Sequence, residues 1–281
     1  MEAALPDRAP RARGAVAVLI PVFDDDGRLR DTLRSLEGQG VPVVAVLVDD
    51  GSARPLSVEG AALDFEVVIL RHDTNQGIEL ALNTGLRYIR SRGLAYVARL
   101  DNGDKCAPGR LARQREFLES NRDVQLVGSA VEWRDTAGRV RFTRVFPTTH
   151  DDIVRALHHT AALIHPAVMF RTSVVDAVGD YSTAYPAAED YEFFFRIARR
   201  HRVANLGETL LVTRFDPDGV SMRRRHEQLR STLRVQLSFF EPGVWTSYYG
   251  VLKTLARLVV PYAWLVRLKA ARTRHSTPVP A

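Results

Sequence analysis

The stretch VVAVLVDDGS, residues 43–52, carries six consecutive apolar residues that lead directly into two aspartates and a Gly-Ser pair. A short β-branched run bounded by turn residues is typical of a strand buried on both faces of a parallel sheet. Residues 15–20, AVAVLI, repeat this pattern, and after Pro21 they too lead into acids, at 24–26, and a glycine. Two such strands predict an α/β architecture whose strands end in acidic loops.

Further elements continue this alternation along the first hundred residues. Residues 66–70 (EVVIL) and 95–100 (AYVARL) are two more apolar runs, and the apolar positions 29, 33 and 36 and then 78, 82, 86 and 89 recur at helical spacing. Strands that alternate with helices form βαβ units. We therefore expect a Rossmann-like α/β fold with a mixed, mainly parallel sheet flanked by helices.

The second half of the chain is less regular. Residues 124–131 and 138–146 predict two strands around a turn, 151–158 a helix, 165–171 a short apolar segment and 188–200 a second helix. Glu189 and Asp190 fall in the first turn of that second helix, where acids interact favourably with the helix dipole. His158 and His159 lack the spacing of a zinc site, so we predict that they lie on the helix surface.

The composition indicates how many domains the chain can form and in which cellular compartment the protein is expected. With 281 residues, 46% of them hydrophobic, the chain can form one large domain with an appendage. We expect a disordered tail at 1–13, a globular domain at 14–221 and a basic, amphipathic helical extension at 222–281. A single cysteine, Cys106, excludes an internal disulfide framework, and no signal-peptide pattern opens the sequence. These features predict a cytoplasmic protein.

The positive charge of the chain is concentrated at its C-terminal end. The net charge is +6, and residues 222–281 contain eleven Lys or Arg against two Glu. These cations alternate with Leu, Val, Trp and Tyr, which suits an anionic membrane surface better than a nucleic acid. Lys253, Arg257 and Pro261 interrupt the apolar run before it could span a bilayer. We expect residues 244–274 to lie on the inner face of the membrane, or to pack on the domain or on a second subunit of a homodimer.

The fourth apolar run ends in RLDNGDK, residues 99–105, which places Asp101 and Asp104 on either side of an Asn-Gly pair. Asn-Gly favours a tight turn, whereas the two carboxylates would suit Mg²⁺ or Mn²⁺. Ligands of open α/β sheets bind beyond the carboxyl ends of the strands. Because three strand ends carry acids, the context favours a site for a metal or polar ligand. Neither a GxxxxGK[ST] loop nor a GxGxxG fingerprint is present.

Seven segments together resemble the inverting nucleotide-sugar glycosyltransferases with the GT-A fold (family 2-like). In order, they are VAVLIPVFDDDGRLRDTLRSLEGQ, VLVDDGS, NQGIELALNTGLRYIR, RLDNGD, PGRLARQREFL, HPAVMFR and AEDYEFFFRIA, and they cover about residues 15–220. The resemblance implies a sugar transfer by single displacement. The acceptor is expected to be a saccharide or lipid-linked saccharide of the cell envelope, and UDP is the expected nucleotide of the donor.

The resemblance also implies roles for individual residues. Asp190 corresponds to the general base, with Glu189 beside it, and Asp101 and Asp104 are the expected metal ligands. His165 and Trp133 are candidates for the acceptor side. The expected donor-binding residues are Pro21, Val22, Asp24, Asp49, Asp50, Asn75, Gly77, Asn83, Arg99 and Asp101.

Two departures from the family pattern bear on the cofactor. The family signature reads Asp-x-Asp-Asp, and Gly103 takes its third position here, so a divalent cation, Mn²⁺ or Mg²⁺, is expected at a weakened site. The histidine that often follows the final strand is absent near residues 213–219, which leaves Arg214 and His226 as substitutes. An alternative is a metal-independent or inactive sugar-nucleotide-binding relative that serves as a membrane-associated scaffold.

Overall fold

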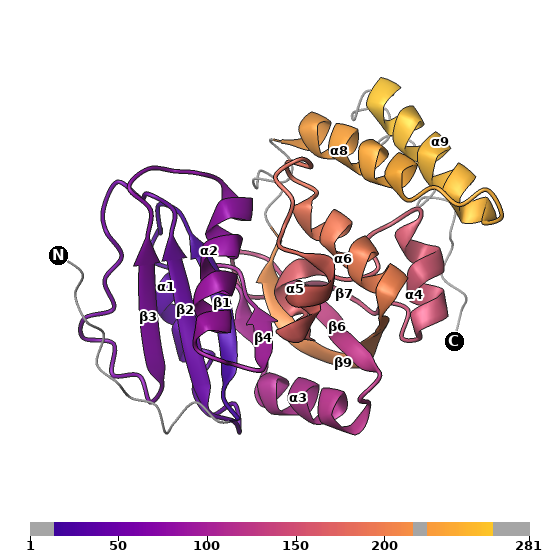
Figure 1. The fold of residues 1–281 in the computed structure, drawn as a ribbon. Coiled ribbons are helices and arrows are strands. Elements are labelled where there is room, and N and C mark those ends of the chain that lie inside the picture. Colours follow the sequence, from indigo (N-terminus) through magenta and orange to yellow (C-terminus); the bar gives the residue numbers. More distant parts are fainter. Residues whose placement is uncertain (1–13, 216–223, 261–281) are drawn as a thin grey trace, which may run out of the picture.

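The computed structural model describes residues 14–215 and 224–260, and one mixed sheet forms its centre (Figure 1). Within this part the sheet has nine strands in the order β3-β2-β1-β4-β8-β6-β9-β5, with β7 paired to β6. The strands are β1 (Val16–Val22), β2 (Val43–Asp49), β3 (Glu66–Arg71), β4 (Tyr96–Arg99), β5 (Lys105–Cys106), β6 (Val124–Arg134), β7 (Val140–Arg144), β8 (Met169–Arg171) and β9 (Arg202–Arg214).

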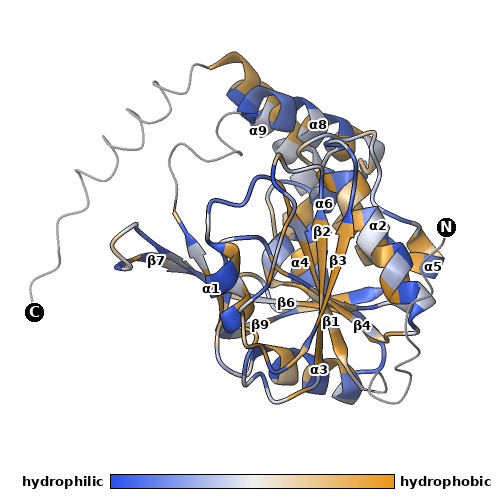
Figure 2. Ribbon diagram, turned by 90° about the vertical axis from the view of Figure 1, so that its left-hand side faces the viewer, coloured by the Kyte–Doolittle hydropathy of each residue, from blue (hydrophilic) through white to orange (hydrophobic). Residues whose placement is uncertain are grey.

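Helices cover both faces of this sheet. They are α1 (Leu29–Arg34), α2 (Ile78–Ser91), α3 (Arg110–Ser120), α4 (His150–Leu157), the 3-10 turn η1 (His165–Ala167), α5 (Ser173–Val178), α6 (Glu189–Arg200), α8 (Arg225–Ser238) and α9 (Trp245–Val259). One apolar core contains buried residues of α2, α4, α5 and α6, and the other contains those of α1 and α3. Figure 2 shows hydrophobic strands between helices of mixed character. The predicted α/β fold with helices flanking a mixed sheet is confirmed.

The two halves of the sheet differ in strand direction. Strands β3, β2, β1 and β4 are all parallel, and the seven residues of β2 are all buried. Strand β8 runs antiparallel to both β4 and β6, while β6 and β9 are parallel. The apolar runs of the first half thus form the fully buried strands that their composition predicts. Their carboxyl ends meet at one edge of the sheet.

Helices α8 and α9 pack together on the body of the protein (Figure 1). Gly250 of α9 lies against the end of α4, where an added Cβ would stand 1.8 Å from the carbonyl oxygen of His158. Ser247 Oγ lies 3.0 Å from His158 Nδ1, and Lys253 Nζ donates to the carbonyl of His159 at 3.0 Å. His158 is therefore buried, and its predicted position on the surface is wrong because α9 covers it.

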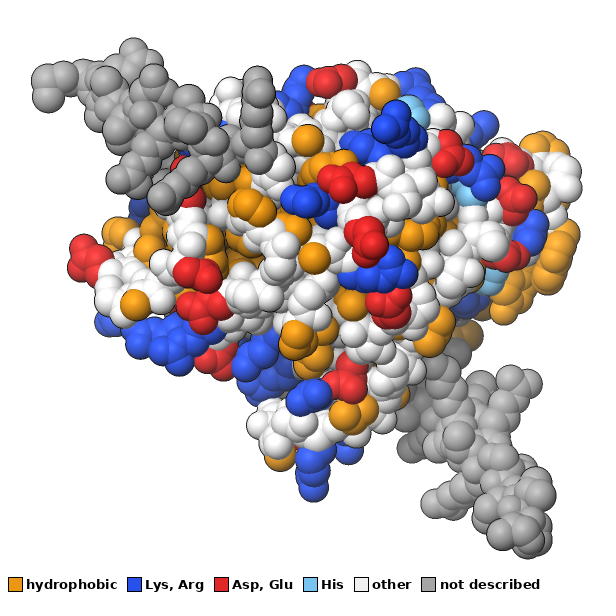
Figure 3. Space-filling view, turned by 90° about the horizontal axis from the view of Figure 1, so that it is seen from below, with side chains coloured by type: hydrophobic (Ala, Val, Ile, Leu, Met, Phe, Trp, Pro, Cys, Tyr) orange, Lys and Arg blue, Asp and Glu red, His pale blue; other side chains and the backbone are white. Residues whose placement is uncertain are grey.

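Two predictions concern the ends of the chain. The tail at 1–13 lies outside the described residues, as does the part of the 244–274 segment beyond residue 260. Within the described part, no helix is both long and apolar enough to cross a membrane. On the face seen from below, acidic and basic side chains are interspersed (Figure 3).

Candidate active site

A cavity of about 640 Å³ lies at the carboxyl ends of β1, β2 and β4. Its volume is within the range of small-molecule sites in proteins. Most of the predicted site residues line it: Pro21, Val22, Asp24, Asp50, Asn75, Gly77, Asp101, His165, Glu189 and Asp190. The structure therefore brings together acids from strand ends that lie far apart in the sequence.

The loops after β1 and β2 are joined by hydrogen bonds. Asp24 has a positive φ of 48°, its backbone N–H donates to Ser52 Oγ at 2.9 Å, and its carboxylate accepts from the N–H of Ala53 at 2.9 Å. Gly51 has a φ of 73°, and an added Cβ there would stand 2.3 Å from the backbone of Thr74. The glycine is thus required for the close approach of the β2 loop to the next loop of the cavity.

Asp50 organises the loop that precedes α2. Its carboxylate accepts from the backbone N–H groups of Gln76 at 2.9 Å and Gly77 at 2.8 Å, and His72 Nδ1 lies 2.7 Å away. Gly77 is the N-cap of α2 and has a φ of 96°. These contacts hold Asn75 and Gly77 at the wall of the cavity.

Asp101 is fixed by the fully buried Arg99. The Arg99 guanidinium pairs with the Asp101 carboxylate and also donates to the carbonyls of Leu19 at 2.8 Å and Leu100 at 2.9 Å. Its Nε donates to His165 Nε2 at 3.0 Å. Arg99 itself does not line the cavity, and its side chain reaches the site through Asp101 and His165.

His165 is held in one protonation state by these neighbours. Arg99 Nε can only donate, so His165 Nε2 must accept and the ring proton lies on Nδ1. Burial, together with the charge of Arg99, lowers the pKa of His165 well below its usual range. The ring lines the cavity as a neutral imidazole, and both Arg99 and the Tyr181 hydroxyl, 2.9 Å away, contact its Nε2.

Glu189 and Asp190 line the cavity from the start of α6, in the second half of the chain. The preceding Ala187 has a positive φ of 60°, a conformation that costs free energy for a residue with a Cβ. Burial raises the pKa of Glu189, and the charge of Asp190 raises it further. Burial also raises the pKa of Asp190, although a hydrogen bond from the N–H of Tyr191 at 2.7 Å opposes this. At neutral pH the pair favours an ionised Asp190 beside a protonated Glu189.

The other predicted residues do not line the cavity, and each forms a hydrogen bond or a ring contact within the protein. The Asn83 side chain donates to and accepts from the backbone of Tyr181, both at 2.9 Å. Trp133 stacks on Phe142 with ring centroids 4.9 Å apart. The carboxylate of Asp49 is fully buried; burial opposes its ionisation, yet hydrogen bonds from Ser52, Leu56 and Arg71 lower its pKa. These side chains support the fold around the cavity.

Asp104 is turned into the protein instead of the cavity. It is buried, and desolvation together with the charge of Asp101 raises its pKa, while a hydrogen bond from Thr213 acts in the opposite direction. Gly103 has a φ of 97°, and its N–H donates to Thr32 Oγ1 at 2.9 Å, which sets the direction of this turn. The structure thus leaves Asp101 as the cavity-lining carboxylate of the predicted metal pair.

The residues present fit a divalent cation that is shared with a ligand. Within the described part of the chain, no three His, Cys, Asp or Glu side chains gather into a metal site. Mg²⁺, however, is often bound by one or two carboxylates together with substrate phosphates and water. The Asp101 side chain is 42% exposed at the cavity, so it could supply one such carboxylate.

From helix α8 the sequence pointed only to His226, and it did not predict which residues in and directly before this helix line the cavity. Arg224, next to that helix, and Gln228 within it line the cavity, whereas Arg214 lies at a different hollow beside β7. The sequence signal is the basic run RRRHEQ at 223–228, whose first residue lies outside the described part. Arg224 pairs with Glu227 at 2.6 Å and brings a cation to the wall of the cavity.

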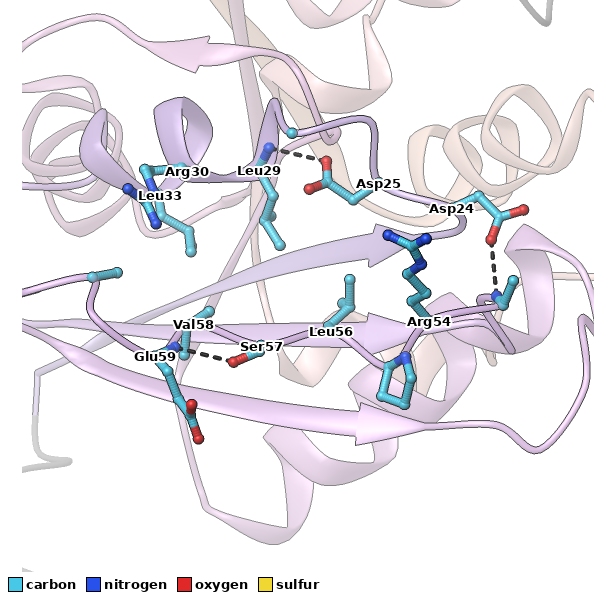
Figure 4. Close-up of a pocket in the computed structure, with 14 residues that line it drawn as sticks. Asp24, Asp25, Leu29, Arg30, Leu33, Arg54, Leu56, Ser57, Val58 and Glu59 are labelled. Carbon is cyan, nitrogen blue, oxygen red and sulfur yellow. Dashed lines mark hydrogen bonds between the residues drawn. The ribbon is translucent and has the colours of Figure 1, made fainter.

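A neighbouring cavity of about 520 Å³ adjoins the site at Asp24 (Figure 4). Leu29 and Leu33 of α1 line it on one side, and Leu56 and Val58 of the loop after β2 line it on the other. Asp25 accepts from the N–H of Leu29 at 3.1 Å and so fixes the start of α1. This second hollow lies beside the first along the edge of the sheet.

Known proteins with the same fold and sequence pattern identify the family. Residues 17–179 match the family model described as glycosyl transferase family 2. The amylovoran biosynthesis glycosyltransferase AmsE of Erwinia amylovora is 31% identical over 255 residues, which are 86% of this chain and 94% of that protein.

Solved structures are similar in fold at low sequence identity. The S. aureus TarS fragment 1–349 in complex with UDP-GlcNAc has a TM-score of 0.61 at 17% identity, over 86% of this chain and 72% of that one. A mannosyltransferase from Pyrobaculum calidifontis in complex with GDP-Man and Mn²⁺ has a TM-score of 0.59 at 17% identity, over 94% of this chain and 76% of that one. The chain therefore has the GT-A fold and belongs to glycosyl transferase family 2.

Proposed function

We propose that the protein transfers a sugar, with inversion, from a nucleotide-sugar to a saccharide or lipid-linked saccharide. One observation carries this proposal: Asp50 and Asp101 at the strand ends line the same cavity as the Glu189–Asp190 pair of α6. A displacement needs the leaving group and the base on opposite sides of the reacting carbon. The cavity offers strand-end acids for the donor and, from a different element, a carboxylate for the base.

The chemistry assigns a separate role to each group. An acceptor hydroxyl attacks C1 of the sugar, the new C1–O bond forms as the bond from C1 to the phosphate oxygen breaks, and the proton passes to the Asp190 carboxylate. Glu189, in its protonated form, lies beside Asp190 in the wall of the cavity. Arg99 holds Asp101 in place on the donor side. A divalent cation, Mn²⁺ or Mg²⁺, bound by Asp101 and the donor's diphosphate would neutralise charge on the departing nucleotide.

The names of related proteins support a role in polysaccharide synthesis and the choice of donor class. AmsE is named for amylovoran biosynthesis, and the two similar structures hold UDP-GlcNAc and GDP-Man. We propose UDP as the nucleotide and an envelope polysaccharide as the pathway. We further propose that residues 14–221 form the catalytic domain and that the protein works in the cytoplasm at the inner face of the membrane.

The replacement Asp190→Asn tests the proposal. Loss of a general base lowers turnover by about 10²–10⁴-fold, while the binding of nucleotide is retained. Asp151→Asn, which removes an exposed acid from the first turn of α4, is the matched control and leaves turnover unchanged. Turnover is measured as nucleotide release in the presence of acceptor. A D190N variant as active as the wild type would exclude Asp190 as the base.

A donor screen by thermal shift, with and without Mn²⁺, tests the donor class. The melting temperature should rise with one or more nucleotide-sugars, and more so with Mn²⁺. If no nucleotide-sugar stabilises the protein under either condition, the proposed function fails. Stabilisation without Mn²⁺ and without turnover would favour the metal-independent or inactive scaffold.

A further inference from the structure

A smaller cavity of about 250 Å³ adjoins the candidate active site at its catalytic end. Ala161, Leu163, Ala187, Asp190 and Gln228 line both cavities. Because Asp190 belongs to both, a molecule held in the smaller cavity can place a hydroxyl at this carboxylate while the larger cavity holds the donor. The smaller cavity therefore has the location that an acceptor passage requires.

The walls of this passage come from the C-terminal helices. Gln228, Thr232 and Gln236 of α8 and Thr254 of α9 line it opposite the loop that follows α4. Amide and hydroxyl groups of this kind form hydrogen bonds with sugar hydroxyls. The body of the protein supplies Asp190, and α8 and α9 supply most of the polar contacts.

Two basic side chains of α9 line the passage. Lys253 and Arg257 are one helical turn apart on α9, and both line the cavity; among the described residues that line it, Asp190 is the only acid. Burial, together with the charge of Arg225, lowers the pKa of Arg257. An anion bound between these groups would relieve the repulsion between like charges. Phosphate is an anion that arginine binds through two parallel hydrogen bonds.

The solvent-exposed face of α9 carries the large apolar residues, whereas most helices of soluble proteins bury such residues. The helix buries the small residues Ser247, Gly250 and Thr254 against the protein. It exposes large apolar residues on the other side, among them Trp245 (69% exposed), Leu252 (65%) and Val259 (82%). Tyr248 and Leu255 are exposed between them, so the set forms one stripe at helical spacing. A helix of a soluble protein normally turns such a stripe inward.

A lipid surface fits this stripe. Tryptophan and tyrosine beside apolar residues are typical of helices in the membrane interface, where flanking cations contact anionic headgroups. Lys253 and Arg257 lie on the flank of α9, between its buried face and the stripe, and residues 222–281 carry eleven Lys or Arg against two Glu. The charge and the apolar face are therefore complementary to an anionic membrane.

We propose that the passage binds a saccharide joined through phosphate to a membrane lipid, with the phosphate on Arg257 and the α9 stripe on the bilayer. The sugar then reaches Asp190 from the membrane side while the nucleotide-sugar enters from the opposite side. The assignment of the passage to the acceptor rests on the proposed function. The binding of phosphate and of lipid can be measured without any transfer reaction.

Vesicle sedimentation with the full-length chain tests the stripe. The protein should pellet with phosphatidylcholine vesicles that contain phosphatidylglycerol, and Leu252→Glu should lower the bound fraction by roughly tenfold or more. Val145→Glu places the same charge at an equally exposed position after β7 and should bind as the wild type does. Failure of the wild type to bind, or equal binding by L252E, overturns the lipid assignment. A wild-type dimer that L252E converts to a monomer also overturns it, because a second copy would then cover the stripe.

Calorimetry with a short-chain alkyl phosphate tests the passage, with the alkyl glucoside of equal length as the uncharged comparison. The wild type should bind the phosphate more tightly than the glucoside, and Arg257→Ala should reduce phosphate affinity by about tenfold. Arg230→Ala removes the same charge from an exposed position of α8 outside the cavity and should have little effect. Equal affinities in R257A and R230A, or inorganic phosphate binding as tightly as alkyl phosphate, overturn the proposal.

UDP and GDP binding by the same variants separates the two proposals. R257A and L252E should bind nucleotide as the wild type does, because neither residue lines the larger cavity. A protein that binds alkyl phosphate through Arg257 and binds no nucleotide-sugar contradicts the proposed transfer reaction and leaves the phosphate site in place. A protein that binds nucleotide but shows no dependence on Arg257 contradicts the passage alone.

Discussion

Arg99 shows how one buried side chain can organise a site that it does not line. Its guanidinium joins the carbonyl of Leu19 in β1, the carbonyl of Leu100 just after β4, the carboxylate of Asp101 and the ring of His165. A buried cation is tolerated only when its donors are satisfied, and these partners provide that. Asp101 and His165 thereby reach the cavity in fixed orientations. The sequence could predict that Arg99 lies at the end of a strand, but not that its side chain points inward.

Arg99→Lys should weaken the site although it keeps the charge. A single ammonium cannot reproduce the planar fork that reaches Asp101, His165 and two carbonyls, so some of these partners lose a hydrogen bond inside the protein. We expect a loss of about 1–3 kcal/mol in the free energy of unfolding, measured by urea denaturation, and about tenfold weaker UDP binding by calorimetry.

Arg113→Lys is the matched control for this change. Arg113 forms an exposed pair with Glu208 at 2.9 Å, and such pairs contribute about 1 kcal/mol or less. Its replacement should leave UDP binding unchanged. If R99K and R113K behaved alike, the positioning role of Arg99 would be excluded.

Among the elements, prediction succeeded where the local pattern was strong. Strands β1 to β4 and helices α2 and α6 form close to where apolar runs and helical spacing place them. Strand β9 was missed because its sequence, RVANLGETLLVTR, places polar residues and a glycine within the run. Its pairing with β6, far away in the chain, stabilises it instead. Long-range pairing of this kind leaves little trace in local sequence.

The sequence could not decide between packing and membrane contact for the C-terminal helices. Residues 244–260 contain large apolar side chains throughout, so their composition fits either. The structure shows that the packing contact depends on small residues: Ser247, Gly250 and Thr254 face the protein. A pattern of small residues at this spacing was the overlooked signal for the docked face of α9.

Gly250→Ala should displace α9 from α4. The added Cβ would stand 1.8 Å from the carbonyl oxygen of His158, and a backbone atom cannot move aside as a side chain tip can. We expect about 1–3 kcal/mol lower stability. Hydrogen–deuterium exchange should show faster exchange of the α9 amides, and the affinity for alkyl phosphate should fall with it.

Gly243→Ala provides the comparison, since no atom lies within 4 Å of a Cβ added there. This variant should exchange and bind as the wild type does. Equal exchange in G250A and G243A would show that α9 is not held by this contact.

At the scale of the whole molecule, three parts of the chain meet at Asp190. The parallel half of the sheet supplies Asp50 and Asp101, α6 supplies the acid pair, and α8 supplies Gln228. The strand-end acids could be predicted because parallel strands end at a common edge. Their meeting with α6 and α8 could not, because it depends on the packing of the second half. The buried acids at this meeting point also link catalysis to overall stability.

The pH dependence of the wild type and Glu189→Gln tests that link. Burial raises the pKa of Glu189 above that of the unfolded chain, so the folded state binds the more protons between the two values and the free energy of unfolding falls as pH rises through this window. Glu189→Gln removes this titrating group, so the stability of the variant should fall less steeply over the same window, as measured by urea denaturation at several pH values.

Because Glu189 acts in its protonated form, E189Q should also keep most of the wild-type turnover, whereas D190N should lose it. In the wild type, the acidic limb of kcat/KM should lie above the ordinary pKa range of an aspartate, because burial raises the pKa of Asp190. An inactive E189Q alongside an active D190N would reverse the roles of the two acids.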